Sequence, residues 1–185
     1  MKTVEPIRDE AVREAFIEYF EERSDRNLAL FLMGVYTGFR ISDILKLKVR
    51  DVQGKMHLEI TESKTGKPRK VVIHRRLKRP LEQLTHGRSK FEYLFESRQR
   101  TRTGKKKPIE RSTVDKMLKK AAKALGHDEP IATHSMRKTF GYMYYKEYKD
   151  IAELQRLFNH SSPEITLRYI GLQQERFDEN VANLR

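Results

Sequence analysis

The segment "RNLALFLMGVYTG", residues 26–38, constrains the fold more than any other stretch of this chain. It is apolar on nearly every side of a helix, so that helix has to be buried. Ser24 and Asp25 precede it as candidate capping residues, and Gly38 ends it. The sequence therefore predicts a core organised around one buried helix.

The rest of the pattern is mostly helical, with one β element. The strand patterns "MHLEI" and "RKVVIH", joined by the turn "ESKTGKP", predict a hairpin or a three-stranded sheet within residues 56–74. No repeat or composition shift marks a second domain. We therefore expect one α+β domain over residues 1–185, mainly α-helical with a small antiparallel β-sheet. Helical spacing and capping residues predict further helices at residues 9–22, 40–47, 112–125, 133–148, 150–158, 163–169 and 173–184.

The charge of the chain favours a polyanionic partner. Its 39 lysines and arginines exceed its 26 acidic residues, which gives a formal net charge of +13. So large an excess is typical of proteins that bind nucleic acid, and an anionic membrane surface is the second candidate. The absence of cysteine excludes disulfides and thiolate metal sites. The N-terminus has no signal-peptide pattern and no apolar run is long enough to span a membrane, so we expect a cytoplasmic protein.

Basic residues are concentrated between positions 98 and 107, where no apolar side chain is present. We expect a solvated, mobile loop. Contact with DNA phosphates and plain exposure to solvent are about equally favoured interpretations. The candidate DNA-binding residues are Arg98, Arg100, Arg102, Lys105, Lys106 and Lys107.

Two short segments near the C-terminus concentrate chemically useful side chains. In "THSMRKTFGY", His134 and Arg137 are three residues apart and share one helix face, with Thr133 as the expected N-cap. The first turn of a helix is suited to binding an anion. In "LFNHSSPEITLRYIG", Ser161 or Ser162 should cap a helix that ends near Tyr169, and His160 should lie in the loop before it.

Three further residues lie earlier in the chain. Arg40 follows the buried helix directly, and Asp43 lies three residues on, where it could orient the guanidinium group of Arg40. Lys64 should stand near the tip of the hairpin. Taken singly, Arg40 and Asp43 could form an ordinary intrahelical salt bridge, and a lysine in a turn is usually just solvated.

Taken together, "TGFRISDIL", "ESKTGK", "HSMRKTFG", "LFNHSS" and "TLRYIG" resemble, in this order, the catalytic domain of tyrosine recombinases, the phage-type integrases and Xer-like enzymes. The resemblance extends from about residue 10 to the C-terminus and implies the catalytic-domain fold of that family. It implies Arg40 and Arg137 as the arginine pair, with Asp43 as acidic support. It also implies six catalytic positions in all, namely Arg40, Lys64, His134, Arg137, His160 and Tyr169.

The chemistry implied is DNA recombination or integration through a covalent 3′-phosphotyrosyl intermediate, without metal, ATP or another cofactor. Two guanidinium groups can take the place of a metal at the phosphate, because each is always charged and presents a planar fork to two oxygens. Tyr169 would be the nucleophile, made more acidic by the arginines, and His134 a general base. Lys64 would protonate the leaving 5′ oxygen.

The chain departs from the family in one respect. Only about nine residues precede the first expected helix, whereas family members usually carry a core-binding domain there. The chain is therefore either a fragment or a naturally minimal integrase of a phage or mobile element. The resemblance also implies double-stranded DNA as partner and a homotetramer on paired sites. The expected helix 173–184 would pack either on its own domain or on a neighbouring protomer.

Two other classes of function remain open. Glu62 and Lys64 have the E-x-K spacing of metal-dependent nucleases, for which Asp51 would be the upstream acidic residue. A non-catalytic DNA-binding or regulatory module would also suit a basic helical domain of this size. Type IB topoisomerases and telomere resolvases would share the chemistry of the main hypothesis.

Overall fold

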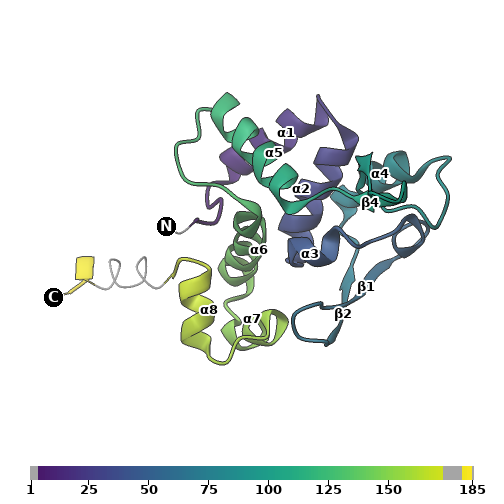
Figure 1. The fold of residues 1–185 in the computed structure, drawn as a ribbon. Coiled ribbons are helices and arrows are strands. Elements are labelled where there is room, and N and C mark those ends of the chain that lie inside the picture. Colours follow the sequence, from purple (N-terminus) through teal and green to yellow (C-terminus); the bar gives the residue numbers. More distant parts are fainter. Residues whose placement is uncertain (1–3, 173–180, 185) are drawn as a thin grey trace.

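A computed structural model describes residues 4–172 and 181–184 of the chain (Figure 1). Its fold is α+β and mainly helical, as the sequence predicts. The strands form two separate antiparallel pairs, β1 (His57–Thr61) with β2 (Pro68–Val72) and β3 (Glu96–Arg100) with β4 (Lys106–Pro108). The helices are α1 (Glu10–Glu21), α2 (Asp25–Thr37), α3 (Ile41–Ile44), the 3-10 turn η1 (Val49–Asp51), α4 (Arg75–Thr85), α5 (Arg111–Ala124), α6 (Thr133–Tyr148), α7 (Ile151–Phe158) and α8 (Pro163–Tyr169).

Helix α2 is the centre of the core, in agreement with its apolar sequence. It packs against α1, α4 and α6, and most of its side chains are buried. Ser24 caps it by accepting a hydrogen bond from the backbone N–H of Asn27. Gly38 ends it in the left-handed conformation, with φ at +59°. This sharp ending leaves Arg40 directly beyond the core.

The hairpin of β1 and β2 forms as expected and projects from the helical body (Figure 1). His57 pairs with Val72 and Thr61 with Pro68, so the turn begins at Glu62. The backbone N–H of Glu62 donates to the carbonyl of Lys67 at 3.0 Å and closes this turn. Lys64 therefore stands in the turn, as predicted.

The basic segment 98–107 differs from its prediction, because its two ends form the hairpin of β3 and β4 rather than a loop throughout. Flanking apolar residues hold it, since Phe95 and Ile109 are buried and joined by a backbone hydrogen bond of 2.8 Å. The amine of Lys106 adds ion pairs to Glu92 and Glu96, at 3.1 and 3.2 Å. Most of the six candidate DNA-binding side chains remain exposed on this hairpin.

Helices α7 and α8 lie side by side and form a second, smaller apolar cluster against α6 (Figure 1). Phe158 and Ile170 are fully buried there and approach Gly141 of α6 closely enough that a Cβ atom would overlap both side chains. Ser162 caps α8 and Pro163 begins it, as expected. The expected helix 173–184 falls mostly outside the described residues.

In the described part of the chain, none of the helices combines the length and the apolar character needed to cross a bilayer.

Candidate active site

Five separate elements bring the candidate catalytic residues to one place. Helix α6 contributes His134 and Arg137 from its first turns, and the end of α8 contributes Tyr169. The remaining three are Arg40 at the start of α3, Lys64 in the β1–β2 turn and His160 in the loop between α7 and α8.

The hydroxyl group of Tyr169 is surrounded by candidate residues. The Nδ1 atom of His134 lies 3.5 Å from the Tyr169 oxygen, and the charge of Arg137 acts to lower the pKa of this hydroxyl. The ring of His160 meets the Tyr169 ring edge-on at 5.2 Å. His160 is itself held by Thr166, whose hydroxyl lies 3.0 Å from its Nδ1 atom. These contacts fix the nucleophile candidate against both histidines.

Arg137 is held at the bottom of the site, with 4% of its side chain exposed. Its Nη1 atom donates to the carbonyl of Gly38, and its Nη2 atom donates to the carbonyl of Phe158 at 3.4 Å. Its guanidinium carbon also lies 4.4 Å from the centre of the Phe158 ring. Arg137 thus links the end of α2 to the end of α7.

Arg40 pairs with Glu62 rather than with Asp43, which corrects the expectation from sequence. Its Nη1 atom lies 2.6 Å from Glu62 Oε2. Arg40 precedes α3 in an extended conformation, so the i, i+3 geometry of a helix does not apply to it. Asp43 accepts hydrogen bonds from the backbone N–H and the hydroxyl of Ser63, at 3.0 and 2.6 Å. Asp43 therefore anchors the β1–β2 turn next to Lys64.

Glu62 and Arg69 add one negative and one positive charge to this site, and the sequence alone did not assign either residue to it. Glu62 is 3% exposed and lies among three guanidinium groups, those of Arg40, Arg69 and Arg137. Arg69 of β2 donates to the carbonyls of Thr37 and Gly38, at 2.9 and 3.2 Å. The sequence had suggested Glu62 only as a metal ligand, and no local pattern distinguishes Arg69 from other strand arginines.

Burial raises the pKa of Tyr169 above its ordinary value, and the opposing effects of Arg137 and Arg40 do not overcome it. The sequence had predicted a more acidic phenol. In the free protein the charge of the arginines is partly neutralised by Glu62, and the ring is largely enclosed. Tyr169 is therefore a neutral phenol at physiological pH.

The two histidines are neutral at physiological pH for a related reason. Desolvation, and next the charges of Arg137, Arg40 and Lys64, lower the pKa of His160 to about 4. Desolvation and the charges of Arg111 and Arg137 also lower the pKa of His134. A neutral His134 beside the Tyr169 hydroxyl can accept a proton.

Lys64 is the least constrained of the six candidates. It is exposed. Its positive charge helps to lower the pKa of His160, and this is its connection to the other catalytic candidates. The other five form one group: His134 and His160 both contact Tyr169, Arg137 acts on the Tyr169 hydroxyl through its charge, and Glu62 connects Arg137 to Arg40.

The first turn of α6 differs from the prediction in its capping. Ala132, not Thr133, is the N-cap, and Thr133 is buried as the first helical residue. Its backbone N–H donates to Asp115 Oδ1 of α5 at 2.8 Å, so a tertiary contact replaces the local cap. The donor expected for an anion is thus already occupied, and Asp115 fixes the turn that carries His134.

A metal site at Glu62 and Lys64 is not supported by the donor set. Glu62 faces guanidinium groups, which disfavour a cation there. Asp51 is occupied by the backbone N–H of Lys48 at 2.8 Å. The described residues contain no cluster of three or more histidine or carboxylate side chains suited to a metal ion.

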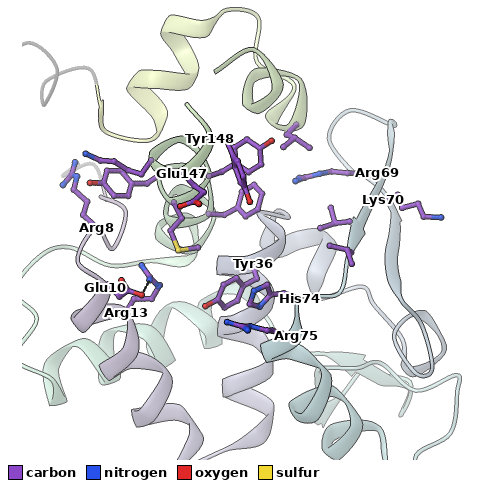
Figure 2. Close-up of a pocket in the computed structure, with 18 residues that line it drawn as sticks. Arg8, Glu10, Arg13, Tyr36, Arg69, Lys70, His74, Arg75, Glu147 and Tyr148 are labelled. Atoms are coloured by element: carbon purple, nitrogen blue, oxygen red, sulfur yellow. Dashed lines mark ion pairs between the residues drawn. The ribbon is translucent and has the colours of Figure 1, made fainter. Parts of the chain in front are cut away.

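A cavity of about 1030 Å³ lies beside this site rather than in it (Figure 2). Tyr36 and His74 stack at 4.0 Å on one side of it, and Tyr148 of α6 lies on another. Arg69 points from β2 toward α6, whereas Lys70 points away. Of the residues that the structure describes, Arg69 alone both lines this cavity and contacts Glu62 in the candidate active site.

Comparisons with known proteins agree on one family. Residues 8–176 match the model of the phage integrase family. The chain is 47% identical over 175 residues to the probable integrase/recombinase YoeC of Bacillus subtilis, covering 95% of this chain and 93% of that protein. It is 28% identical over 159 residues to tyrosine recombinase XerA of Pyrococcus horikoshii, covering 85% of this chain and 53% of that protein, so it spans about half the length of this relative.

A solved structure shows the same fold. The crystal structure of the site-specific recombinase XerH, bound to its palindromic difH substrate in a post-cleavage complex, aligns with a TM-score of 0.71 at 18% identity. The alignment covers 98% of this chain and 54% of that chain.

Proposed function

The chain belongs to the phage integrase family, whose relatives include tyrosine recombinases, and on this basis we propose that it cleaves and rejoins DNA strands through a covalent bond to Tyr169. The observation that carries the proposal is the position of the Tyr169 hydroxyl. It lies 3.5 Å from His134 Nδ1, and the charge of Arg137 acts to lower its pKa. The reaction exchanges one phosphodiester bond for another.

The first step is attack by the Tyr169 oxygen on phosphorus. The proton of the phenol passes to Nδ1 of His134, the bond from phosphorus to the 5′ oxygen breaks, and Lys64 protonates that oxygen. The products are a 3′-phosphotyrosyl ester and a free 5′-hydroxyl. Reversal of these steps with another 5′-hydroxyl rejoins the strand and needs no ATP, because the tyrosyl ester retains the energy of the original bond.

Arg40 and Arg137 hold the two non-bridging oxygens of the phosphate. Negative charge grows on these oxygens as the phosphorus becomes five-coordinate, so fixed guanidinium groups stabilise the transition state more than the substrate. His160 adds a hydrogen-bond donor when DNA is bound. The exposed basic side chains of the β3–β4 hairpin, at residues 96–108, contact phosphates of the flanking duplex.

The test of this function is adduct formation on DNA with a nick near candidate cleavage positions, taken from the flanks of the gene. We expect a protein–DNA adduct that survives SDS, forms equally well in EDTA and in magnesium, and disappears on proteolysis. Cleavage without an adduct that EDTA abolishes would favour the metal-dependent nuclease. Salt-sensitive binding with neither cleavage nor an adduct would favour the non-catalytic DNA-binding module.

Recombination joins two sites, so we also propose that copies of the chain assemble on paired DNA through their C-terminal segments. Residues 173–185 contain Phe177 among three acidic residues, Glu175, Asp178 and Glu179. The cavity of Figure 2 offers the complementary chemistry, with exposed Tyr148 at its rim and charged lining residues that are mostly basic, among them Arg8, Arg13, Arg69, Lys70 and Arg75. We propose that this segment of one copy docks in the cavity of the next.

Replacing Phe177 with aspartate is expected to weaken cooperative binding to paired sites about 10-fold, the usual cost of removing an aromatic anchor from an interface. Affinity for a single site should not change. The measurement is a titration of DNA with one site and with two sites, followed by native gel electrophoresis. If the segment packs on its own domain instead, the variant will have a lower melting temperature as a monomer and unchanged cooperativity.

A further inference from the structure

Three largely enclosed arginines share one carboxylate at the base of the candidate active site. Glu62 Oε2 lies 2.6 Å from Nη1 of Arg40, and Glu62 Oε1 lies 3.7 Å from Nη1 of Arg69 and 3.9 Å from Nη1 of Arg137. No more than 18% of any of these side chains is exposed. The carboxylate is therefore shielded from solvent and interacts with all three guanidinium groups.

Glu62 is ionised in this position. Burial acts to raise its pKa, but the ion pair with Arg40, the hydrogen bond from Thr65 and the charge of Arg137 together outweigh burial and hold the pKa below its ordinary value. The hydroxyl of Thr65 donates to Glu62 Oε2 at 2.8 Å and fixes the plane of the carboxylate. Among the described residues, Glu62 Oε1 accepts no hydrogen bond, so its interaction with Arg69 and Arg137 is ionic.

The carbonyl of Gly38 supplies a second fixed acceptor for the same cluster. It accepts hydrogen bonds from both Arg69 and Arg137. Burial and the charge of Arg137 lower the pKa of Arg69 to about 10, a sign of how closely the like charges approach. Without an internal anion, three guanidinium groups at this separation would repel one another.

The formal charge of the cluster matches the transition state of the proposed reaction better than its substrate. Three guanidinium groups and one carboxylate leave two positive charges. A DNA phosphodiester carries one negative charge, and the five-coordinate transition state carries about two. Binding that strengthens as this charge develops accelerates the reaction.

We propose that Glu62 is a positioning residue of the active site, an internal counter-ion that holds Arg40 and Arg137 in place and sets the charge that the phosphate meets. The proposal rests on the proposed function and deepens it. It also assigns Arg69 a part in the site, as the third cation that Glu62 balances.

The test replaces Glu62 with glutamine, which keeps the shape of the side chain and removes its charge. We expect cleavage of nicked DNA in a single turnover to slow by at least about 10-fold. Non-covalent DNA affinity, measured with the Tyr169→Phe substitution added, should stay equal or increase. The pH profile of cleavage should shift to lower pH, because an additional net positive charge lowers the pKa of Tyr169.

The matched control is Glu59→Gln, which removes a carboxylate of β1, three residues before Glu62, that forms an exposed ion pair with Lys70 at 2.7 Å. This control should change neither rate nor pH profile. Arg69→Met provides the decisive measurement through a double-mutant cycle. If Glu62 acts through charge, Arg69→Met will slow cleavage less in the Glu62→Gln protein than in the wild type, because it then removes the unbalanced cation.

The outcomes separate the two proposals. If the wild type forms no adduct although it binds DNA, the proposed function fails. If the wild type forms the adduct and Glu62→Gln keeps the wild-type rate and pH profile, the role of Glu62 is overturned. Strict additivity with Arg69→Met also overturns it, as does a loss of rate that equals the unfolded fraction measured by circular dichroism.

Discussion

Tyr169→Phe is expected to abolish the covalent protein–DNA adduct, with a loss of cleavage of at least about 10⁴-fold. The substitution removes the single oxygen that would attack phosphorus. The ring remains, so its edge-on contacts with Phe158 at 5.4 Å and His160 at 5.2 Å should keep α8 in place. Affinity for duplex DNA, measured by fluorescence anisotropy, should therefore be unchanged.

The matched control for this prediction is another tyrosine of the same apolar cluster. Tyr145→Phe also removes one phenolic oxygen, but Tyr145 lies in α6 and its ring contacts Lys149. It should form the adduct at the wild-type rate. An adduct that persists in Tyr169→Phe and is lost in Tyr145→Phe would contradict the assignment of the nucleophile.

The raised pKa of Tyr169 has a consequence for when the site becomes reactive. In the free protein burial keeps the phenol neutral, and Glu62 balances part of the charge of the arginines. A DNA phosphate would place its oxygens against Arg40 and Arg137, and attack requires a base at the same moment. His134 is suited to this, because its lowered pKa keeps its ring neutral to a lower pH than usual.

The helices were predictable because their signals are local. Ser24, Asp150 and Ser162 each accept a hydrogen bond from a backbone N–H two or three residues into the helix that follows. The turn of the first hairpin likewise follows from its Gly/Pro composition. The six candidate catalytic positions were predicted differently, through the resemblance of five ordered motifs to tyrosine recombinases, each motif confined to a few residues.

The features that sequence alone did not predict depend on contacts between distant segments. Arg40 and Glu62 come from different elements, so sequence spacing suggested Asp43 instead. The hairpin of β3 and β4 was missed because residues 98–107 contain no apolar side chain, and the residues that hold it lie just outside. The backbone N–H of Thr133 is satisfied by Asp115, eighteen residues earlier in the chain.

Gly38→Ala should have the largest effect on stability among the substitutions considered, because this position joins the core to the site. A Cβ atom there would overlap the ring of Phe140, and φ at +59° disfavours any side chain. Backbone strain costs about 1–2 kcal/mol and overpacking about 1–3 kcal/mol, so we expect a loss of about 2–5 kcal/mol. Thermal unfolding followed by circular dichroism should show a melting temperature lower by about 5–20 °C.

Gly54→Ala separates the two causes of this loss. Gly54 has nearly the same backbone conformation, with φ at +68°, but no atom lies within 4 Å of its added Cβ. It should lose only the strain energy and keep full cleavage activity. Gly38→Ala should also cleave more slowly at temperatures where it is fully folded, because its carbonyl accepts from both Arg69 and Arg137 and a shifted carbonyl displaces both guanidinium groups. Equal stability of the two variants would mean that Phe140 moves aside at little cost. A normal cleavage rate in folded Gly38→Ala would mean that Glu62 holds the arginines without help from the carbonyl at the end of α2.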